Sequence, residues 1–374
     1  MKVEIREAIT TSEIKKFVRF PHKLYKKCKQ YVPVLDKDEI RSLTASPSLS
    51  YCKLRLWLAY SDHNKIVGRI AGIYNPRANE YHNNKRIRFG WFDFVEDIEV
   101  ASALLGKVEE WGVSLGMEEI HGPLGYNTWY RQGVLIEGFE NTPPANCLYN
   151  YPYYRSILEQ LGYGKQLDWK QIKLAANVGV PDKLKRINEM IMDRYKLRIA
   201  DIEMFKNNDK MLLEFFESYN TSFRNIDNFV PLDREEILEI GREYIPLLKK
   251  ELTCVILDQN DKIAAFAICF PSFSEALKKA HGKLFPFGWY HIYRSFKKFD
   301  SIDLMIMGAA KEWQNTGISS VIHTYLATRF KELDLQYAIT NPQAEENSVF
   351  KVWERYHYSP YMKRRCYIKS LQKA

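Results

Sequence analysis

The stretch IDLMIMGAAKEWQNTGISSVIHTYLATRFKEL, residues 302–333, places a strand directly ahead of a helix. Ile302–Met307 is apolar apart from Asp303, which is typical of a buried strand. From Gly317 onward, apolar residues recur at helical spacing, at positions 318, 321, 322, 325, 326 and 330. The polar turn between them, Trp313–Ser319, would gather free backbone N–H groups and the positive end of a helix dipole. The turn therefore predicts an anion site, above all for phosphate.

The spacing inside this turn, Gln314-x-x-Gly317-x-Ser319, resembles the acyl-CoA pyrophosphate loop of the GNAT acyltransferase superfamily. In that loop, Arg or Gln is followed by x-x-Gly-x-Gly or Ala. Glycine at 317 fits, because it lets backbone amides approach a diphosphate without an intervening Cβ. Ser319 departs from the pattern and either crowds the diphosphate or donates a hydrogen bond to it. The alternative is a capped turn that binds no ligand.

The resemblance implies a site for acetyl-CoA or another acyl-CoA. The residues expected to bind this cofactor are Gly308, Ala309, Gln314, Asn315, Thr316, Gly317, Ile318, Ser319 and Asn347. In this family an amine attacks the thioester directly. The protein must therefore take a proton from the ammonium, hold the carbonyl oxygen and protonate or stabilise the leaving thiolate.

Three residues are the candidates for catalysis. Asp303 interrupts an apolar strand and is either a base, acting directly or through water, or a side chain that points to solvent. Trp353 occupies the position at which many family members carry a tyrosine acid. The nearest tyrosines, Tyr356 and Tyr358, are therefore the predicted proton donors, with a place in an aromatic core as their alternative.

The chain repeats its pattern. HNKIVGRIAGI at 63–73 matches NDKIAAFAICF at 260–270, and LGMEEIHGP at 115–123 matches LDLQYAITNP at 333–342. We expect two tandem GNAT-like α/β domains, residues 1–178 and 179–374, each with a mixed, mostly antiparallel sheet flanked by helices. The segments at 67–82, 121–129, 133–144, 149–154 and 282–289 resemble a bacterial group of tandem GNAT proteins of undefined substrate.

The first copy lacks the phosphate loop. Its corresponding junction, DFVEDIEVASALLG at 93–106, places four carboxylates, Asp93, Glu96, Asp97 and Glu99, where a phosphate would lie. Carboxylates satisfy a helix N-terminus themselves and repel a diphosphate. We expect a degenerate cofactor site in this copy.

Composition limits the class of protein. The 374 residues are 46% hydrophobic, with a formal net charge of +9. No apolar run approaches the roughly 20 residues of a membrane span, and the N-terminus lacks a signal-peptide core, so we expect a cytoplasmic protein. Six cysteines and eight histidines are scattered, so no metal site is predicted. The basic charge is read as a solvated surface, and nucleic-acid binding is not expected.

Two further segments have open interpretations. Five residues lie in or just after a long loop, residues 122–150: Tyr126, Asn127, Tyr149, Asn150 and Tyr153. They either line an acceptor pocket or hold the loop through hydrogen bonds. The insertion 271–300 contains FPFGWYHIYRSF at 285–296. A buried helix is its default interpretation, and a lid, a partner surface or a transient membrane contact are the alternatives.

The leading functional hypothesis is an acyl-CoA-dependent N-acyltransferase, leaning toward acetyl transfer to a small-molecule or peptide amine. The alternative is a non-catalytic CoA-binding or CoA-sensing module, in which Ser319 and Trp353 reflect lost chemistry. A third hypothesis is transfer from aminoacyl-tRNA, which the basic charge would suit. The sequence does not identify the acceptor, the acyl length or the oligomeric state.

Overall fold

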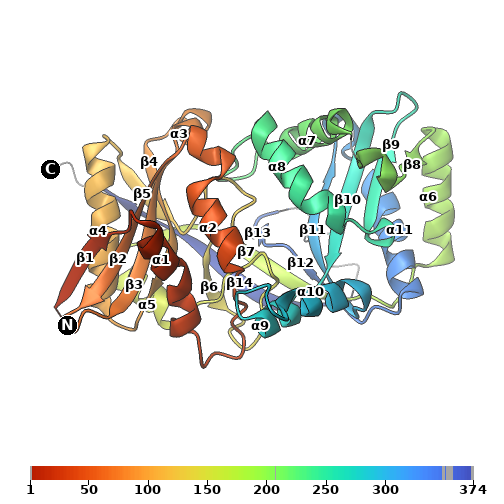
Figure 1. Ribbon diagram of the computed structural model, residues 1–374. Coiled ribbons are helices and arrows are strands. Elements are labelled where there is room, and N and C mark those ends of the chain that lie inside the picture. The colour runs from red at the N-terminus through yellow and green to blue at the C-terminus, as the bar shows by residue number, and fades with distance from the viewer. Residues whose placement is uncertain (1, 207, 348–349, 351–356, 372–374) are drawn as a thin grey trace.

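The strands of this protein form one continuous sheet. The computed structural model describes residues 2–206, 208–347, 350 and 357–371. The main path of the sheet follows the order β1-β2-β3-β4-β5-β14-β7-β12-β11-β10-β9-β8, with β6 paired to β14 and β13 paired to β7 (Figure 1). The mixed, mostly antiparallel sheet flanked by helices that the sequence predicts is confirmed.

The first half of the chain contains, in order, β1 (Val3–Glu7), α1 (Thr11–Leu24), α2 (Asp36–Thr44), β2 (Lys53–Ser61), β3 (Ile66–Tyr74), α3 (Pro76–Tyr81), β4 (Arg86–Phe94), α4 (Ile98–Ser114), β5 (Glu119–Gly122), β6 (Val134–Glu137), α5 (Tyr153–Gln160) and β7 (Gly164–Ala175). The second half contains α6 (Asp182–Arg194), β8 (Arg198–Ile199), α7 (Asp209–Phe223), α8 (Arg234–Tyr244), β9 (Thr253–Leu257), β10 (Ile263–Pro271), α9 (Ser274–Ala280), α10 (Gly288–Lys297), β11 (Ser301–Ala309), α11 (Ile318–Glu332), β12 (Tyr337–Thr340), β13 (Gln343–Ala344) and β14 (Tyr358–Ser370).

Local chemistry explains where several helices begin and end. Thr10 and Glu13 form a capping box at the start of α1, and Asp233 and Glu236 form another at the start of α8. The sequence predicts that α8 continues to Leu252, but it ends at Tyr244. A 3₁₀ turn, Ile245–Leu247, follows there and contains Pro246, which cannot donate a helical hydrogen bond.

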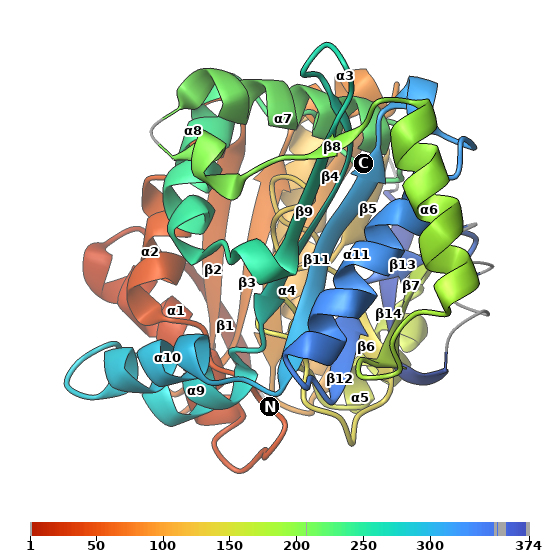
Figure 2. The same cartoon turned by 90° about the vertical axis from the view of Figure 1, so that its right-hand side faces the viewer.

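Each half consists of a sheet between two helical layers (Figure 2). In the first half, α1 and α2 pack on one face, and α4 and α5 on the other. In the second half, α6 and α11 share one core with β9–β12, while α7 and α8 share another on the opposite face. Side chains that alternate along each strand therefore enter two different cores.

The two halves exchange their last strands. β14, at the C-terminal end of the chain, lies between β5 and β7, with Ile368 opposite His121 and Arg364 opposite Trp169. β7, the last strand of the first half, pairs in turn with β12, where Leu174 lies opposite Ala338. The sheet continues from one half to the other without a break, so it does not mark a domain boundary. The boundary after residue 178 therefore stays a prediction.

This exchange predicts that residues 179–374 do not fold alone. Without the first half, β14 and β12 lose the neighbouring strand β7 and expose backbone groups that pair in the whole chain. Far-UV circular dichroism and gel filtration should show an aggregated or poorly ordered fragment. Co-expression with residues 1–178 should restore a soluble complex, whereas a cooperatively folded monomer of residues 179–374 would contradict the exchange.

Candidate functional site

The predicted phosphate turn lies at the N-terminus of α11, and glycine has a conformational role in it. Gly317 caps the helix with φ 89°, in the left-handed region that favours glycine, and no side chain caps this end. Ser320 N–H bonds to the Gly317 carbonyl, so the amides of Ile318 and Ser319 precede the first helical hydrogen bond. These two amides and the helix dipole point in the direction from which an anion can approach.

Other residues of the turn maintain its shape. The Thr316 hydroxyl donates to the Trp313 carbonyl at 2.7 Å, and the Gln314 side-chain amide donates to the Ala309 carbonyl at 3.4 Å. Gln314, Asn315, Gly317 and Ser319 are exposed, whereas Ile318 is buried in the core under α11. Asn347 lies beyond β13, where its backbone N–H donates to the Ala344 carbonyl. Exposed amides beside a glycine give the turn the chemistry of an anion site.

The central strand β11 continues past its parallel neighbour. β11 pairs with β12 only from Ser301 to Leu304, and a side-chain bond from Asn341 to the Met305 carbonyl follows at 2.9 Å. Beyond that point, no described strand pairs with this edge of β11 as far as Ala309. Gly308 lies so close to the Phe266 ring that an added Cβ would be 2.7 Å from it. The strand edge that leads to the turn thus has no strand partner among the described residues, although the Ala309 carbonyl accepts hydrogen bonds from the side chains of Ser222 and Gln314.

Asp303 is buried in this strand, at 6% exposure, so the alternative that its side chain points to solvent is wrong. Burial raises the pKa of Asp303 to about 7, and a hydrogen bond with the Ser272 side chain partly offsets this effect. No described residue bonds to its Oδ1 atom. A carboxyl with this pKa and a free oxygen can exchange a proton near neutral pH.

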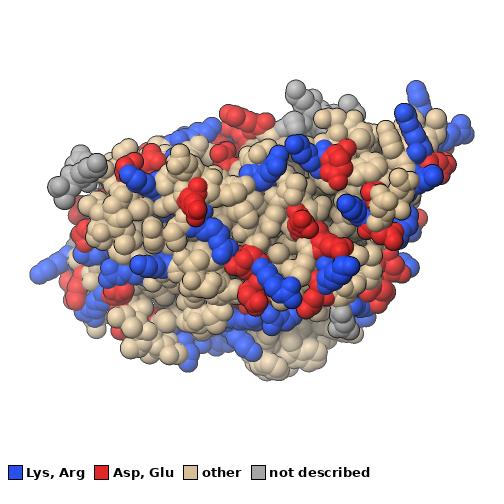
Figure 3. Space-filling model, turned by 90° about the horizontal axis from the view of Figure 1, so that it is seen from above, with Lys and Arg blue, Asp and Glu red and all other residues tan. Residues whose placement is uncertain are grey.

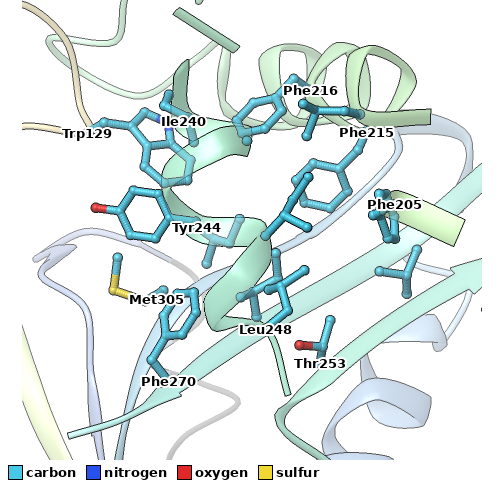
Figure 4. Close-up of a pocket in the computed structure, with 16 residues that line it drawn as sticks. Trp129, Phe205, Phe215, Phe216, Ile240, Tyr244, Leu248, Thr253, Phe270 and Met305 are labelled. Carbon is cyan, nitrogen blue, oxygen red and sulfur yellow. The ribbon is translucent and has the colours of Figure 1, made fainter. Parts of the chain in front are cut away.

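An apolar pocket lies between α7, α8 and strands β9–β11 (Figure 4). The residues that line it are Trp129, Phe205, Leu212, Phe215, Phe216, Ile240, Gly241, Tyr244, Ile245, Leu248, Thr253, Val255, Ile268, Phe270, Met305 and Ile306. Met305 and Asp303 are two residues apart in one strand, so they face the same side of the sheet. An aliphatic chain in this pocket would lie beside the strand that carries the buried carboxyl.

The pocket was not predicted from the sequence. Leu212, Phe215 and Phe216 recur at helical spacing in α7, which indicates an amphipathic helix but does not separate core from pocket. The aromatic richness of α7 was the available signal. Trp129 is the one residue of the long loop that lines this pocket.

The five predicted acceptor residues use their polar atoms within the protein. The hydroxyls of Tyr126, Tyr149 and Tyr153 donate to the carbonyls of Ser42, Phe139 and Phe94. Asn150 bonds the backbone of Leu135 in both directions, and Asn127 donates to Glu236. These bonds favour the structural interpretation of the loop, and an acceptor-binding role stays a prediction.

Neither predicted proton donor is found beside the turn in the part of the chain that the structure describes. Tyr356 and Trp353 lie outside this part. Tyr358 begins β14 and lies opposite Leu174, in the same row as Ala338 and Ile302. It is thus near the start of β11, away from Gly308, Ala309 and the turn. Its role as an acid stays a prediction without support from this geometry.

The first copy differs at the corresponding junction. The Asp97 side chain caps α4 by accepting from Glu99 N–H, and Asp93 is buried in an ion pair with Arg69 at 2.7 Å. Asp97 supplies the charge that an anion would bring to this helix end. Elsewhere in the described part of the chain, no cluster of three His, Cys, Asp or Glu side chains could hold a metal ion.

The similarity to known proteins is distant but covers most of the chain. No family model matches the sequence. "Protein YghO" of Escherichia coli is 26% identical over 383 residues, covering 98% of this chain and 95% of its own. "Bacterial ceramide synthase" of Caulobacter vibrioides is 25% identical over 317 residues, covering 82% and 80%.

A solved structure described as a tandem GNAT protein from the clavulanic acid biosynthesis pathway matches with a TM-score of 0.59 at 10% identity. The match covers all of both chains. At this identity, the likeness concerns the fold. The protein therefore has the fold of the tandem GNAT proteins, which the sequence motifs predict.

Proposed function

We propose that the protein is an acyl-CoA-dependent N-acyltransferase in which the acyl donor or the amine acceptor carries a long aliphatic chain. The observation that carries this proposal is the apolar pocket beside β11. Its walls offer almost no hydrogen-bonding groups, so a sugar or a peptide would lose its water contacts there without replacement. A hydrocarbon chain gains by burial instead, at about 25 cal/mol for each Å² removed from water.

The turn at Gly317 supports the identity of the donor. A diphosphate would accept hydrogen bonds from the amides of Ile318 and Ser319, and the remainder of the donor would follow the open edge of β11. The Ala309 amide would hold the thioester carbonyl, because Ala310 N–H donates to Ala264 of β10 and successive amides of a strand point to opposite edges. The corresponding end of α4 is closed by Asp97, so we assign one cofactor site to the chain, in its second half.

Asp303 supports the reaction type. Asp303 lies five residues before Gly308 in the same strand, roughly 16 Å away at about 3.3 Å per residue. In its ionised form, it would therefore take the proton of the attacking amine only through intervening water molecules, as the new C–N bond forms and the C–S bond breaks. No described residue close to the turn supplies the proton that the thiolate gains. Tyr356, which lies outside the described residues, and Tyr358 of β14 remain the predicted sources.

The relative named as a ceramide synthase supports the substrate class. A ceramide is a long-chain base whose amine carries a fatty acyl group, so its synthesis joins two aliphatic chains through an amide. The apolar pocket suits one such chain. The competing hypothesis, a CoA sensor without chemistry, predicts CoA binding without turnover. An aminoacyl-tRNA donor predicts no acyl-CoA binding at all.

The cofactor assignment predicts the effect of changes at Ser319, which is exposed and outside the core. Ser319→Glu adds a negative charge to the first turn of α11, which favours the helix but repels a diphosphate. Acyl-CoA affinity measured by calorimetry should fall at least tenfold, or about 1.4 kcal/mol, with no loss of thermal stability.

Two companion variants complete the test. Gly317→Val should weaken binding similarly, although it also strains a backbone with φ 89°. Ser319→Gly should bind equally well, or lose roughly 0.5–1.5 kcal/mol if the hydroxyl itself contacts the diphosphate. Normal binding by Ser319→Glu would refute the cofactor site.

Asp303 predicts opposite effects of pH on activity and stability. As a base, Asp303 must be ionised, so activity should rise with pH and reach half its maximum near pH 7. Because its pKa is raised from 3.8 to about 7 in the folded protein, its contribution to stability is fully present below pH 3.8 and is lost as pH rises from there to about 7.

Asp303→Asn should separate these effects. At pH 8 the variant should unfold at no lower temperature than the wild type, yet lose roughly 100-fold or more in turnover. Full activity in Asp303→Asn would exclude this residue as the base.

The substrate proposal is tested by thiol release from CoA. Primary alkyl amines of increasing chain length are paired with acetyl-CoA or palmitoyl-CoA, so dependence on the amine chain or on the acyl chain shows which one the pocket holds. Ile240→Glu places a charge in the pocket wall and should abolish the preference for a long chain.

Ile226→Glu is the matched control, because Ile226 is partly buried against the same core but does not line the pocket. It should keep the preference. Activity confined to short or polar substrates would refute the aliphatic substrate but leave the cofactor site standing.

A further inference from the structure

The insertion between β10 and β11 exposes large aromatic side chains. Phe285 and Phe287 precede α10 and are 77% and 71% exposed, while Trp289, Tyr290 and Tyr293 on the helix are 50%, 47% and 55% exposed. The default interpretation of this segment as a buried helix is wrong for its outer face. Exposed aromatic side chains grouped in this way commonly mark an interaction surface.

The part of this insertion that contains α10 is strongly basic. Residues 276–299 include no Asp or Glu, and their exposed cations are Lys279, Lys283, Arg294, Lys297 and Lys298. None of these five forms an ion pair with a carboxylate of the described residues. By contrast, charges of both signs are interspersed over the upper face of the molecule (Figure 3), whereas α10 lies on the underside in Figure 1.

The protein holds this segment in a fixed position. Within the segment, Gly288 lies so close to the Lys283 carbonyl that an added Cβ would be 1.9 Å away, which fixes the turn that leads into α10. The Ser295 hydroxyl donates to the Ser272 carbonyl at 3.0 Å, and the Lys249 ammonium lies 4.2 Å from the centre of the Phe296 ring. The inner face of α10 is thus tied to the body, and the segment extends outward from it (Figure 2).

We propose that α10 and residues 283–287 form a docking surface for an anionic phospholipid bilayer. Tyrosine and tryptophan favour the interface between headgroups and acyl chains, and phenylalanine inserts below it. Lysine and arginine around them attract anionic headgroups. A helix with aromatic and basic side chains on its outer face lies in the interface without spanning it. Indeed, no described helix is both long and apolar enough to span a bilayer.

The docking surface adjoins the apolar pocket. Lys249, which contacts Phe296 of α10, directly follows the pocket residue Leu248. Ser272, which accepts the hydrogen bond from Ser295, lies two residues beyond the pocket residue Phe270. A bilayer bound at α10 would lie near a pocket suited to aliphatic chains. The docking proposal itself does not depend on acyl transfer, because it concerns vesicle binding only.

Co-sedimentation with vesicles tests the proposal. The full-length protein should bind vesicles made of equal parts phosphatidylglycerol and phosphatidylcholine, and bind pure phosphatidylcholine about tenfold less. Phe287→Ser with Trp289→Ser should lower binding to the anionic vesicles about tenfold, and so should Lys283→Glu with Arg294→Glu.

Matched controls change equally exposed residues on other surfaces. Ile9 and Met190 are 75% and 70% exposed, and Ile9→Ser with Met190→Ser should leave binding unchanged. Lys183→Glu with Arg186→Glu, on α6, controls for net charge.

Four results would overturn the proposal. The first three are no binding to either type of vesicle, an equal loss of vesicle binding in the control variants, and full binding by both α10 variants. A fourth is self-association of the wild type that the aromatic pair of substitutions abolishes without any effect on vesicles, which would assign the surface to a second copy of the chain. Unchanged thermal unfolding confirms that each variant is folded. If the Phe287→Ser, Trp289→Ser variant does not fold, vesicle binding by the Lys283→Glu, Arg294→Glu variant tests the proposal.

Discussion

The exchange of β7 and β14 between the halves is the constraint on which the rest of the structure depends. Each of these strands pairs with the other, and each also borders a strand of the opposite half. The backbone hydrogen bonds of the sheet therefore cross from one half to the other. Separating the halves would expose strand edges, which folded proteins avoid.

Side chains reinforce this connection on the α8 side. Glu236 of α8 is buried and accepts hydrogen bonds from Ser48, Tyr51 and Asn127, all in the first half. A buried carboxylate is stable only when such donors surround it. The long loop of the first half thus serves to position α8, which forms a wall of the apolar pocket. In this way the first copy contributes to a site whose cofactor turn lies in the second.

Local patterns in the sequence predicted the elements that depend on local chemistry. The strand before Gly317, the turn and α11 follow from apolar spacing and from the conformational freedom of glycine. The exchange of strands could not be predicted in this way, because β14 and β5 are more than 200 residues apart and pairing partners leave no trace in periodicity. The sequence shows Asp303 as the one polar residue in an apolar strand, but whether its side chain is buried depends on packing against elements distant in the sequence.

The same distinction applies to the aromatic residues. Phe216 and Trp289 both occur in helical segments, yet the first lines a pocket and the second is half exposed. Their different surroundings are set by tertiary packing and by the close approach of Gly288 to Lys283.

The central claim is that one site joins the turn at Gly317, the open edge of β11 and the apolar pocket. A crystal structure of the full chain with a long-chain acyl-CoA and an alkyl amine tests it most directly. The account predicts the diphosphate on the amides of Ile318 and Ser319, the thioester near Gly308 and an aliphatic chain beside Met305. A diphosphate bound elsewhere, or both hydrocarbon chains outside the pocket, would contradict it.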